Sequence, residues 1–370
     1  MSAGQPGLLF ISAHLPSREV PQAGQRVAYD RVREFAQRFD VTLVSFFNEA
    51  EAPYAQRYAM PECRQVALFP VSRWSRLLAV LTHPLLPIRA AVRMDGAATR
   101  HIRSLLARER FAAVHCEFTA AAAYLNLIGP GVRTSVTEID LTYQLFERQG
   151  ALVGGLAGLV LRSEAGRQKR WELGMLRRCD EIIVLSDKDR RTLVADGIPD
   201  GKISVRVPTV DPMFTNVDRS AVEPGTLLFW GALDRPENAD AVLWFAHTIF
   251  PAVQRRVPGA KLIVAGASPP PSVLALNGPA ITVTGFVADP LEYFRRCQLG
   301  IAPLRRGAGI KLKVLEYLAA GLPVVASPIG AEGIEHPNLI VADGETAFEE
   351  QVVSILQRSP VASPTPRMAT

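Results

Sequence analysis

The stretch PLRRGAGIKLKVLEYLAAGLPVVASPIGAEGIE, residues 303–335, carries the most informative pattern in this chain. A strand pattern ends at its start, two glycines (Gly307 and Gly309) follow, and a helical pattern then begins. Glycines let backbone N–H groups approach a phosphate, and a helix N-terminus favours an anion. Lys311 and Lys313 add positive charge in the first helical turn, where it opposes the helix dipole unless an anion offsets it. The stretch predicts a phosphate-binding strand–loop–helix unit; the alternative is a solvated basic turn.

Glu316 lies in the same helical pattern, inside the apolar run VLEYLAAGLPVV. A carboxylate in such a run is rarely buried without a partner. It could accept hydrogen bonds from vicinal hydroxyls, such as those of a ribose. The alternative is a glutamate on the surface of a helix.

Strand and helix patterns alternate on both sides of this stretch, and the series restarts midway. We predict strands at 7–12, 41–46, 112–116, 134–138, 181–186 and 203–207, then at 226–231, 260–266, 280–284, 298–303, 323–327 and 338–342. Helices are predicted at 238–257, 288–296, 310–320 and 345–357 in the second half. Because the strand runs are apolar throughout, they indicate parallel sheets covered on both faces.

These patterns predict an α/β fold of two Rossmann-like, doubly wound domains that face each other across a cleft. The expected domains are 1–215 and 222–358, with the boundary in the turn-rich segment 208–225 and a flexible tail at 359–370. Ligands of such sheets bind at the carboxyl ends of the strands. We therefore expect the chemistry in the cleft.

Composition narrows the classes of function. The 370 residues carry 41 Lys+Arg and 36 Asp+Glu, a formal net charge of +5, with 48% apolar and 21% charged residues. This composition excludes a disordered chain or a coiled coil, and it does not indicate a nucleic-acid partner. The four cysteines have no metal-ligand spacing and suit a reducing cytosol. No run is long enough to span a membrane, and we expect a cytoplasmic protein without a bound metal.

The stretch 303–335 resembles the donor-binding region of GT-B glycosyltransferases of family 4 (group 1), especially bacterial sugar transferases with a Gly-x-Gly…Lys-x-Leu-Glu pattern. The resemblance covers about residues 7–358. Supporting segments occur in the order found in the family: 8–46, 179–193, 202–214, 226–245, 258–270 and 281–304. The resemblance implies a glycosyltransferase that moves a sugar from a nucleoside diphosphate sugar, UDP- or GDP-linked, to an acceptor hydroxyl, without a cofactor.

The same resemblance implies roles for single residues of the second domain. The glutamate that matches Glu316 binds the ribose hydroxyls of the nucleotide. The loop that matches Gly307 to Ile310 lies against the diphosphate and sugar. Arg235 matches the basic residue that binds the diphosphate, and Lys311 or Lys313 shares that task. In the first domain, Gly24 matches a glycine whose backbone approaches the donor.

The sequence departs from the family where chemistry is expected. Many members have a second glutamate eight positions before the one matching Glu316, and this chain has Ala308 there. Candidate catalytic groups are instead Glu117, Glu138 and Asp140, which follow predicted strands. The other interpretations are strand-end carboxylates and, for Asp140, a helix cap.

The resemblance implies a saccharide or a lipid-linked acceptor, in the assembly of cell-surface polysaccharide or glycolipid, with retention of anomeric configuration. Residues 73–110 and 151–178 are rich in Arg and apolar groups. They predict either a peripheral contact with the inner face of the membrane or two amphipathic helices of an ordinary domain. Two other functions stay open: a nucleotide-sugar epimerase of GT-B architecture, or a non-catalytic GT-B-like binding protein.

Overall fold

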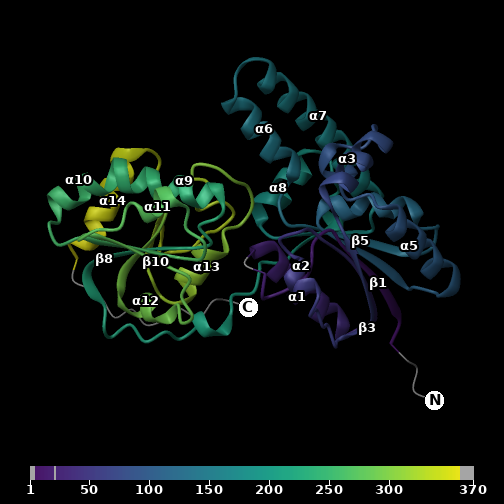
Figure 1. Cartoon of the computed structure of the whole chain (residues 1–370), viewed down its shortest axis with the longest axis horizontal. Coiled ribbons are helices and arrows are strands. Elements are labelled where there is room, and N and C mark those ends of the chain that lie inside the picture. Colours follow the sequence, from purple (N-terminus) through teal and green to yellow (C-terminus); the bar gives the residue numbers. More distant parts are fainter. Residues whose placement is uncertain (1–4, 21, 359–370) are drawn as a thin grey trace. The chain divides into compact units, whose positions relative to one another are not determined.

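All strands of the chain run parallel within two separate sheets, in a computed structural model that describes residues 5–20 and 22–358. The chain divides between Pro208 and Thr209 into two units, each with one sheet and its own core. Figure 1 shows helices on both faces of each sheet. Each unit therefore has the doubly wound arrangement that the strand and helix patterns predict. The predicted flexible tail, 359–370, lies outside the described residues.

The sheet of the first unit has the strand order β3-β2-β1-β4-β5-β6-β7. Its strands are β1 (Gly7–Ser12), β2 (Asp40–Phe47), β3 (Cys63–Pro70), β4 (Ala113–Glu117), β5 (Arg133–Glu138), β6 (Glu181–Val184) and β7 (Ile203–Val205). Its helices are α1 (Ala23–Ala36), α2 (Ala52–Ala55), α3 (Arg73–Thr82), α4 (Ile88–Ala91), α5 (Gly96–Arg108), η1 (Thr119–Leu127), α6 (Thr142–Leu152), α7 (Gly155–Arg178), α8 (Asp187–Ala195) and η2 (Asp200–Lys202).

The sheet of the second unit has the order β10-β9-β8-β11-β12-β13. Its strands are β8 (Glu223–Trp230), β9 (Lys261–Ala265), β10 (Ile281–Gly285), β11 (Cys297–Ala302), β12 (Val324–Ala326) and β13 (Leu339–Val341). Its helices are η3 (Pro212–Phe214), α9 (Pro236–Trp244), the π-helical turn η4 (Phe245–Ile249), α10 (Phe250–Arg256), α11 (Pro271–Leu274), α12 (Leu291–Arg296), α13 (Leu312–Ala319) and α14 (Glu345–Leu356).

Alternation along each central strand divides the core into two layers. In β8, Leu227 and Phe229 pack with α9, α10 and α14, whereas Leu228 packs on the other face with α12 and α13. In β1, Leu9 and Ile11 face α5 and η1, whereas Leu8 and Phe10 face α1. Because both faces are covered, these strands read as continuous apolar runs in the sequence.

The order of strands reverses between β1 and β4 in the first unit and between β8 and β11 in the second. In a doubly wound sheet this reversal leaves a crevice at the carboxyl ends of the two central strands, because the helices that follow them cover opposite faces. A ligand-binding site is therefore expected at both reversal points.

Candidate functional site

The loop between β11 and α13 forms part of the crevice in the second unit. Gly307 has a φ of +121° and Gly309 a φ of +70°, which a residue with a Cβ atom rarely adopts. The ammonium of Lys311 donates to the carbonyl oxygens of Ala308 (3.1 Å) and Gly309 (2.5 Å). Lys311, the N-cap residue of α13, thus links the loop that contains Gly307, Gly309 and Ile310 to the start of the helix.

Lys313 lies in the first turn of α13. Its Nζ donates to Oδ1 of Asn238 (2.7 Å) and lies 4.2 Å from the centre of the Phe229 ring. Gly231 follows β8 with a φ of +149°, which residues with a Cβ atom rarely adopt, and a Cβ there would lie 2.8 Å from Nζ. Burial, followed by the charge of Arg235, lowers the pKa of Lys313 to about 7. The amine can therefore gain a proton when an anion arrives.

Glu316 is buried, with 4% of its surface exposed, and its Oε2 accepts a hydrogen bond from Nε1 of Trp230 (2.9 Å). The interpretation of Glu316 as a surface glutamate is therefore wrong. The indole of Trp230 comes from the end of β8, so this hydrogen bond joins α13 to the strand beside β11. The carboxylate is held in one orientation at the reversal point.

Arg235 precedes α9 and pairs with Glu237 (2.7 Å). Its positive charge is close enough to Lys313 to lower the pKa of that amine. The predicted donor-binding residues of this unit therefore gather at the carboxyl ends of β8 and β11: Arg235, Gly307, Gly309, Ile310, Lys311, Lys313 and Glu316.

Gly24 lies in the first turn of α1, at the reversal point of the first unit. A Cβ at Gly24 would lie 2.9 Å from Cε1 of Phe118, so the ring and the helix can approach only because residue 24 is glycine. Phe118 follows β4 and has a φ of +68°, a conformation that is strained for a residue with a side chain. Such strain clusters at functional sites.

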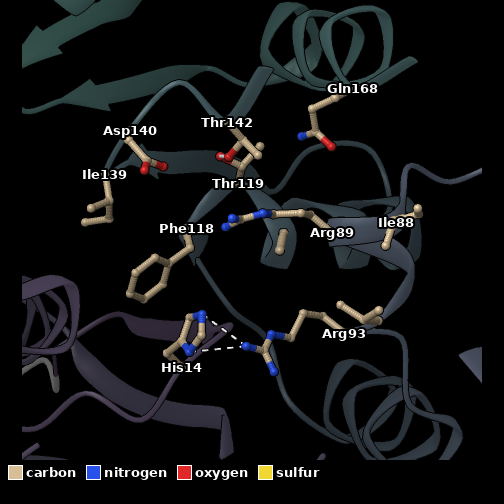
Figure 2. A pocket seen from close by; sticks show the side chains of 12 residues that line it. His14, Ile88, Arg89, Arg93, Phe118, Thr119, Ile139, Asp140, Thr142 and Gln168 are labelled. Carbon is tan, nitrogen blue, oxygen red and sulfur yellow. Dashed lines mark hydrogen bonds between the residues drawn. The ribbon is translucent and has the colours of Figure 1, made fainter. Parts of the chain in front are cut away.

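A pocket of about 240 Å³ lies beside Phe118 (Figure 2). Its walls come from the segments after β1, β4 and β5, and from α4 and α7. The lining residues are His14, Ile88, Arg89, Val92, Arg93, Phe118, Thr119, Ala120, Ile139, Asp140, Thr142 and Gln168. Of the three carboxylates predicted as catalytic candidates, Asp140 lines the pocket.

Asp140 directly precedes Leu141, the N-cap residue of α6. Figure 2 shows its carboxylate near Ile139 and Thr142, on the side of the pocket away from His14.

Glu117 and Glu138 lie in the sheet and do not line the pocket. Glu117 pairs with Nε2 of His115 (2.9 Å), and both side chains are fully buried. Glu138 accepts a hydrogen bond from the hydroxyl of Thr119, a residue that does line the pocket. Burial raises the pKa of Glu138 to about 8, so this carboxyl is mostly protonated at neutral pH.

His14, Arg89, Arg93 and Gln168 line the pocket but were not predicted as site residues. His14 follows β1 at the reversal point, which is the one local signal that pointed to it. The arginines lie in the basic segment 73–110, where no pattern distinguishes them from the other arginines. Gln168 comes from the middle of α7, and its helical pattern gave no sign of a ligand.

Exposed apolar side chains gather on α3, on the segment that follows it, and at the start of α7. Trp74 is 80% and Leu85 is 91% exposed, and Leu77, Leu78, Leu81, Leu156, Leu159 and Val160 are exposed as well. Arg167 of α7 donates to the carbonyl oxygens of Pro84 and Leu86, which holds these segments together. We call these exposed side chains the apolar surface.

Two family models match nearly the whole chain. Residues 24–214 match the model described as Glycosyltransferase Family 4, and residues 224–358 match the one described as Glycosyl transferases group 1. The chain belongs to glycosyltransferase family 4, group 1. It is therefore a glycosyltransferase, as the resemblance in the stretch 303–335 predicted.

Solved structures show the same fold. HepE of Anabaena with UDP and glucose has a TM-score of 0.62 at 12% identity, covering 95% of this chain and 90% of HepE. Sucrose-phosphate synthase of Thermosynechococcus elongatus has a TM-score of 0.67 at 16% identity, with 95% and 90% covered. The lipopolysaccharide outer core galactosyltransferase WaaB has a TM-score of 0.56 at 13% identity, with 94% and 88% covered. These likenesses confirm the predicted GT-B fold.

A relative in Klebsiella pneumoniae, described as an uncharacterized 44.6 kDa protein in the cps region, is 27% identical over 161 residues. The match covers 40% of this chain and 41% of the relative. Within residues 5–20 and 22–358, no group of three or more His, Cys, Asp or Glu side chains could hold a metal ion. None of the described helices is both long and apolar enough to cross a membrane.

Proposed function

We propose that this glycosyltransferase moves a hexosyl group from a UDP- or GDP-sugar to a hydroxyl of a saccharide or lipid-linked acceptor. The reaction retains anomeric configuration, needs no metal, and serves the assembly of cell-surface polysaccharide or glycolipid. The observation that carries the proposal is the cluster of cations and a buried carboxylate at the carboxyl ends of β8 and β11.

The chemistry of that cluster suits a nucleoside diphosphate. Departure of the diphosphate builds negative charge, and Arg235, Lys313 and the glycine loop would stabilise it. These side chains supply the positive charge that a metal ion supplies in other transferases. Glu316 would accept hydrogen bonds from the ribose hydroxyls, because Trp230 already fixes its orientation. HepE with UDP and glucose shows that the fold accommodates such ligands in that protein.

The apolar surface supports a peripheral contact with the cytoplasmic face of an anionic membrane. In an ordinary amphipathic helix the apolar side chains of α3 would pack inward, yet Trp74 is 80% exposed. The exposed arginines Arg73 and Arg89 flank this surface and complement anionic lipid. A lipid-linked acceptor would be reached from such a surface.

Product analysis tests the proposed function. The full chain is incubated with UDP- and GDP-sugars and a panel of saccharide and lipid-linked acceptors, and products are identified by mass spectrometry. Free nucleoside diphosphate together with a glycosylated acceptor supports the proposal, and NMR of the product gives its anomeric configuration. An epimerised donor without an acceptor product would identify an epimerase instead. Donor binding with no turnover across the panel would identify a binding protein.

A further inference from the structure

The pocket beside Phe118 contains a buried cation whose hydrogen-bonding capacity is incompletely used. Arg93 is 8% exposed, and its Nη2 donates to Nε2 of His14 (3.0 Å). Its Nη1 is buried without a hydrogen-bond partner among the described residues. A buried guanidinium N–H without a partner is costly, and a bound anion would remove that cost. The unused N–H group at Nη1 of Arg93 can donate a hydrogen bond to an anion.

The surroundings of Arg93 hold it ready for an anion. Burial lowers the pKa of Arg93 to about 10, so the guanidinium stays charged at neutral pH. Burial and the charge of Arg93 lower the pKa of His14, so the ring is neutral and accepts from the guanidinium. Glu51 also contacts His14, and its Oε1 lies 3.4 Å from Nδ1 of the ring. The carboxylate of Glu51 accepts further hydrogen bonds from the side-chain amide of Gln25 and from the backbone N–H of Asn48.

Arg89 adds a second cation to the same pocket. It lies four positions before Arg93 on the turn of α4, and Figure 2 shows both side chains reaching into the pocket. Two guanidinium groups that line one pocket supply the positive charge that a phosphate favours, and each group can donate through paired N–H groups. Asp140 lies on the other side of the pocket and does not occupy the position of the anion.

The opposite wall of the pocket carries hydrogen-bond acceptors. Gln168 is buried, its Nε2 donates to Glu172 (2.8 Å), and its Oε1 has no partner among the described residues. Together with Asp140 and the hydroxyl of Thr142, it forms a wall that accepts hydrogen bonds from sugar hydroxyls. The pocket therefore has a cationic end for an anion and an accepting end for hydroxyl groups.

We propose that this pocket binds the acceptor, and that the acceptor is a sugar that carries a phosphate group. The phosphate lies between Arg89 and Arg93, and the sugar hydroxyls contact Gln168 and Asp140. This inference rests on the proposed function, because it names the substrate class of the same reaction. The shared chemistry is a glycosyl phosphate ester, either free in solution or linked to a lipid that lies on the adjoining apolar surface.

Calorimetric titration tests this inference without turnover. The full chain, saturated with UDP, is titrated with hexose 1-phosphate and with the same hexose lacking the phosphate. We expect the phosphate to tighten binding about tenfold or more, and Arg89→Gln and Arg93→Gln each to lose most of that gain. Arg103→Gln on α5 is the matched control and should bind like the unaltered chain. Gln168→Met should weaken hexose 1-phosphate but not inorganic phosphate.

The source of the phosphate is distinguished with a second probe, a dialkyl phosphate in phosphatidylcholine vesicles. Binding to the vesicles that depends on the buried Arg93, in preference to hexose 1-phosphate, identifies a lipid-linked acceptor, and the reverse preference identifies a free one. Equal affinity for hexose with and without phosphate would overturn the inference, as would an equal loss in Arg103→Gln. A thermal-shift titration with UDP is run on every variant. Nucleotide binding without phosphate binding would refute this inference alone, whereas binding of neither UDP nor GDP by the unaltered chain would refute the proposed function.

Discussion

Binding of a nucleotide sugar should draw a proton into the protein through Lys313. Its pKa of about 7 means that, in the free protein at pH 8, about one-tenth of the amines are protonated. A diphosphate next to Nζ favours the charged amine and would restore a pKa near the ordinary value. Uptake at pH 8 should therefore approach about 0.9 proton per ligand bound.

The same shift sets the pH dependence of affinity. The protonated fraction of Lys313 falls from about one-half at pH 7 to about 3% at pH 8.5, so the dissociation constant should rise about 15-fold. A UDP-sugar is a suitable ligand, because its phosphates carry no group that titrates in this range.

Isothermal titration calorimetry in two buffers of different ionisation enthalpy measures the uptake directly. Lys313→Met should abolish both the proton uptake and the pH dependence. Lys261→Gln changes an exposed lysine at the start of β9, at the other end of the strands, and should leave both unchanged. Binding of the unaltered chain with no proton uptake at pH 8 would show that Lys313 does not face the phosphates.

Four further changes test other parts of the molecule. Glu316→Gln should weaken donor binding about tenfold with little loss of stability, because the amide oxygen can still accept a hydrogen bond from Trp230. Glu316→Ala should in addition lower the free energy of unfolding by about 1–3 kcal/mol. Chemical denaturation measures the effect on stability, and UDP titration measures the effect on binding. Gly24→Ala should lower turnover at least about tenfold, since its Cβ lies too close to a neighbouring ring, and full activity would contradict this. Stability should fall as pH rises from about 4.5 to about 8 and level off above that, because in this range the folded state keeps the Glu138 proton that the unfolded state has lost; Glu138→Gln should flatten the urea midpoints over the same range. Trp74→Glu should reduce the fraction of the protein that sediments with anionic vesicles, and an unchanged fraction would contradict the proposed membrane contact.

The sequence predicts the position of nearly every central strand, but it does not directly reveal the order of the strands in either sheet. Strands such as β1 and β8 are covered on both faces, so their apolar runs are unbroken and stand out. The strand β3 was missed because it is an edge strand of mixed exposure that includes Arg64 and ends at Pro70. Its pattern resembles that of a loop.

The candidate site was predictable where local chemistry conflicted with local structure. Lysines at the start of α13 and a glutamate in an apolar run broke the ordinary rules, and the structure brings Lys313 and Glu316 together. The pocket beside Phe118 was not predictable, because its walls come from segments as far apart as His14 and Gln168. The burial that makes Arg93 informative is a property of the fold and not of its neighbours in the sequence.

Hydrogen–deuterium exchange of the full chain, with and without a UDP- or GDP-sugar, tests the central claim most directly. We expect the ligand to slow exchange in peptides that cover residues 305–316 and 230–238, the segments that carry the glycine loop, Lys313, Glu316 and Arg235. Confirmed ligand binding with unchanged exchange in both segments would contradict the assignment of the donor site.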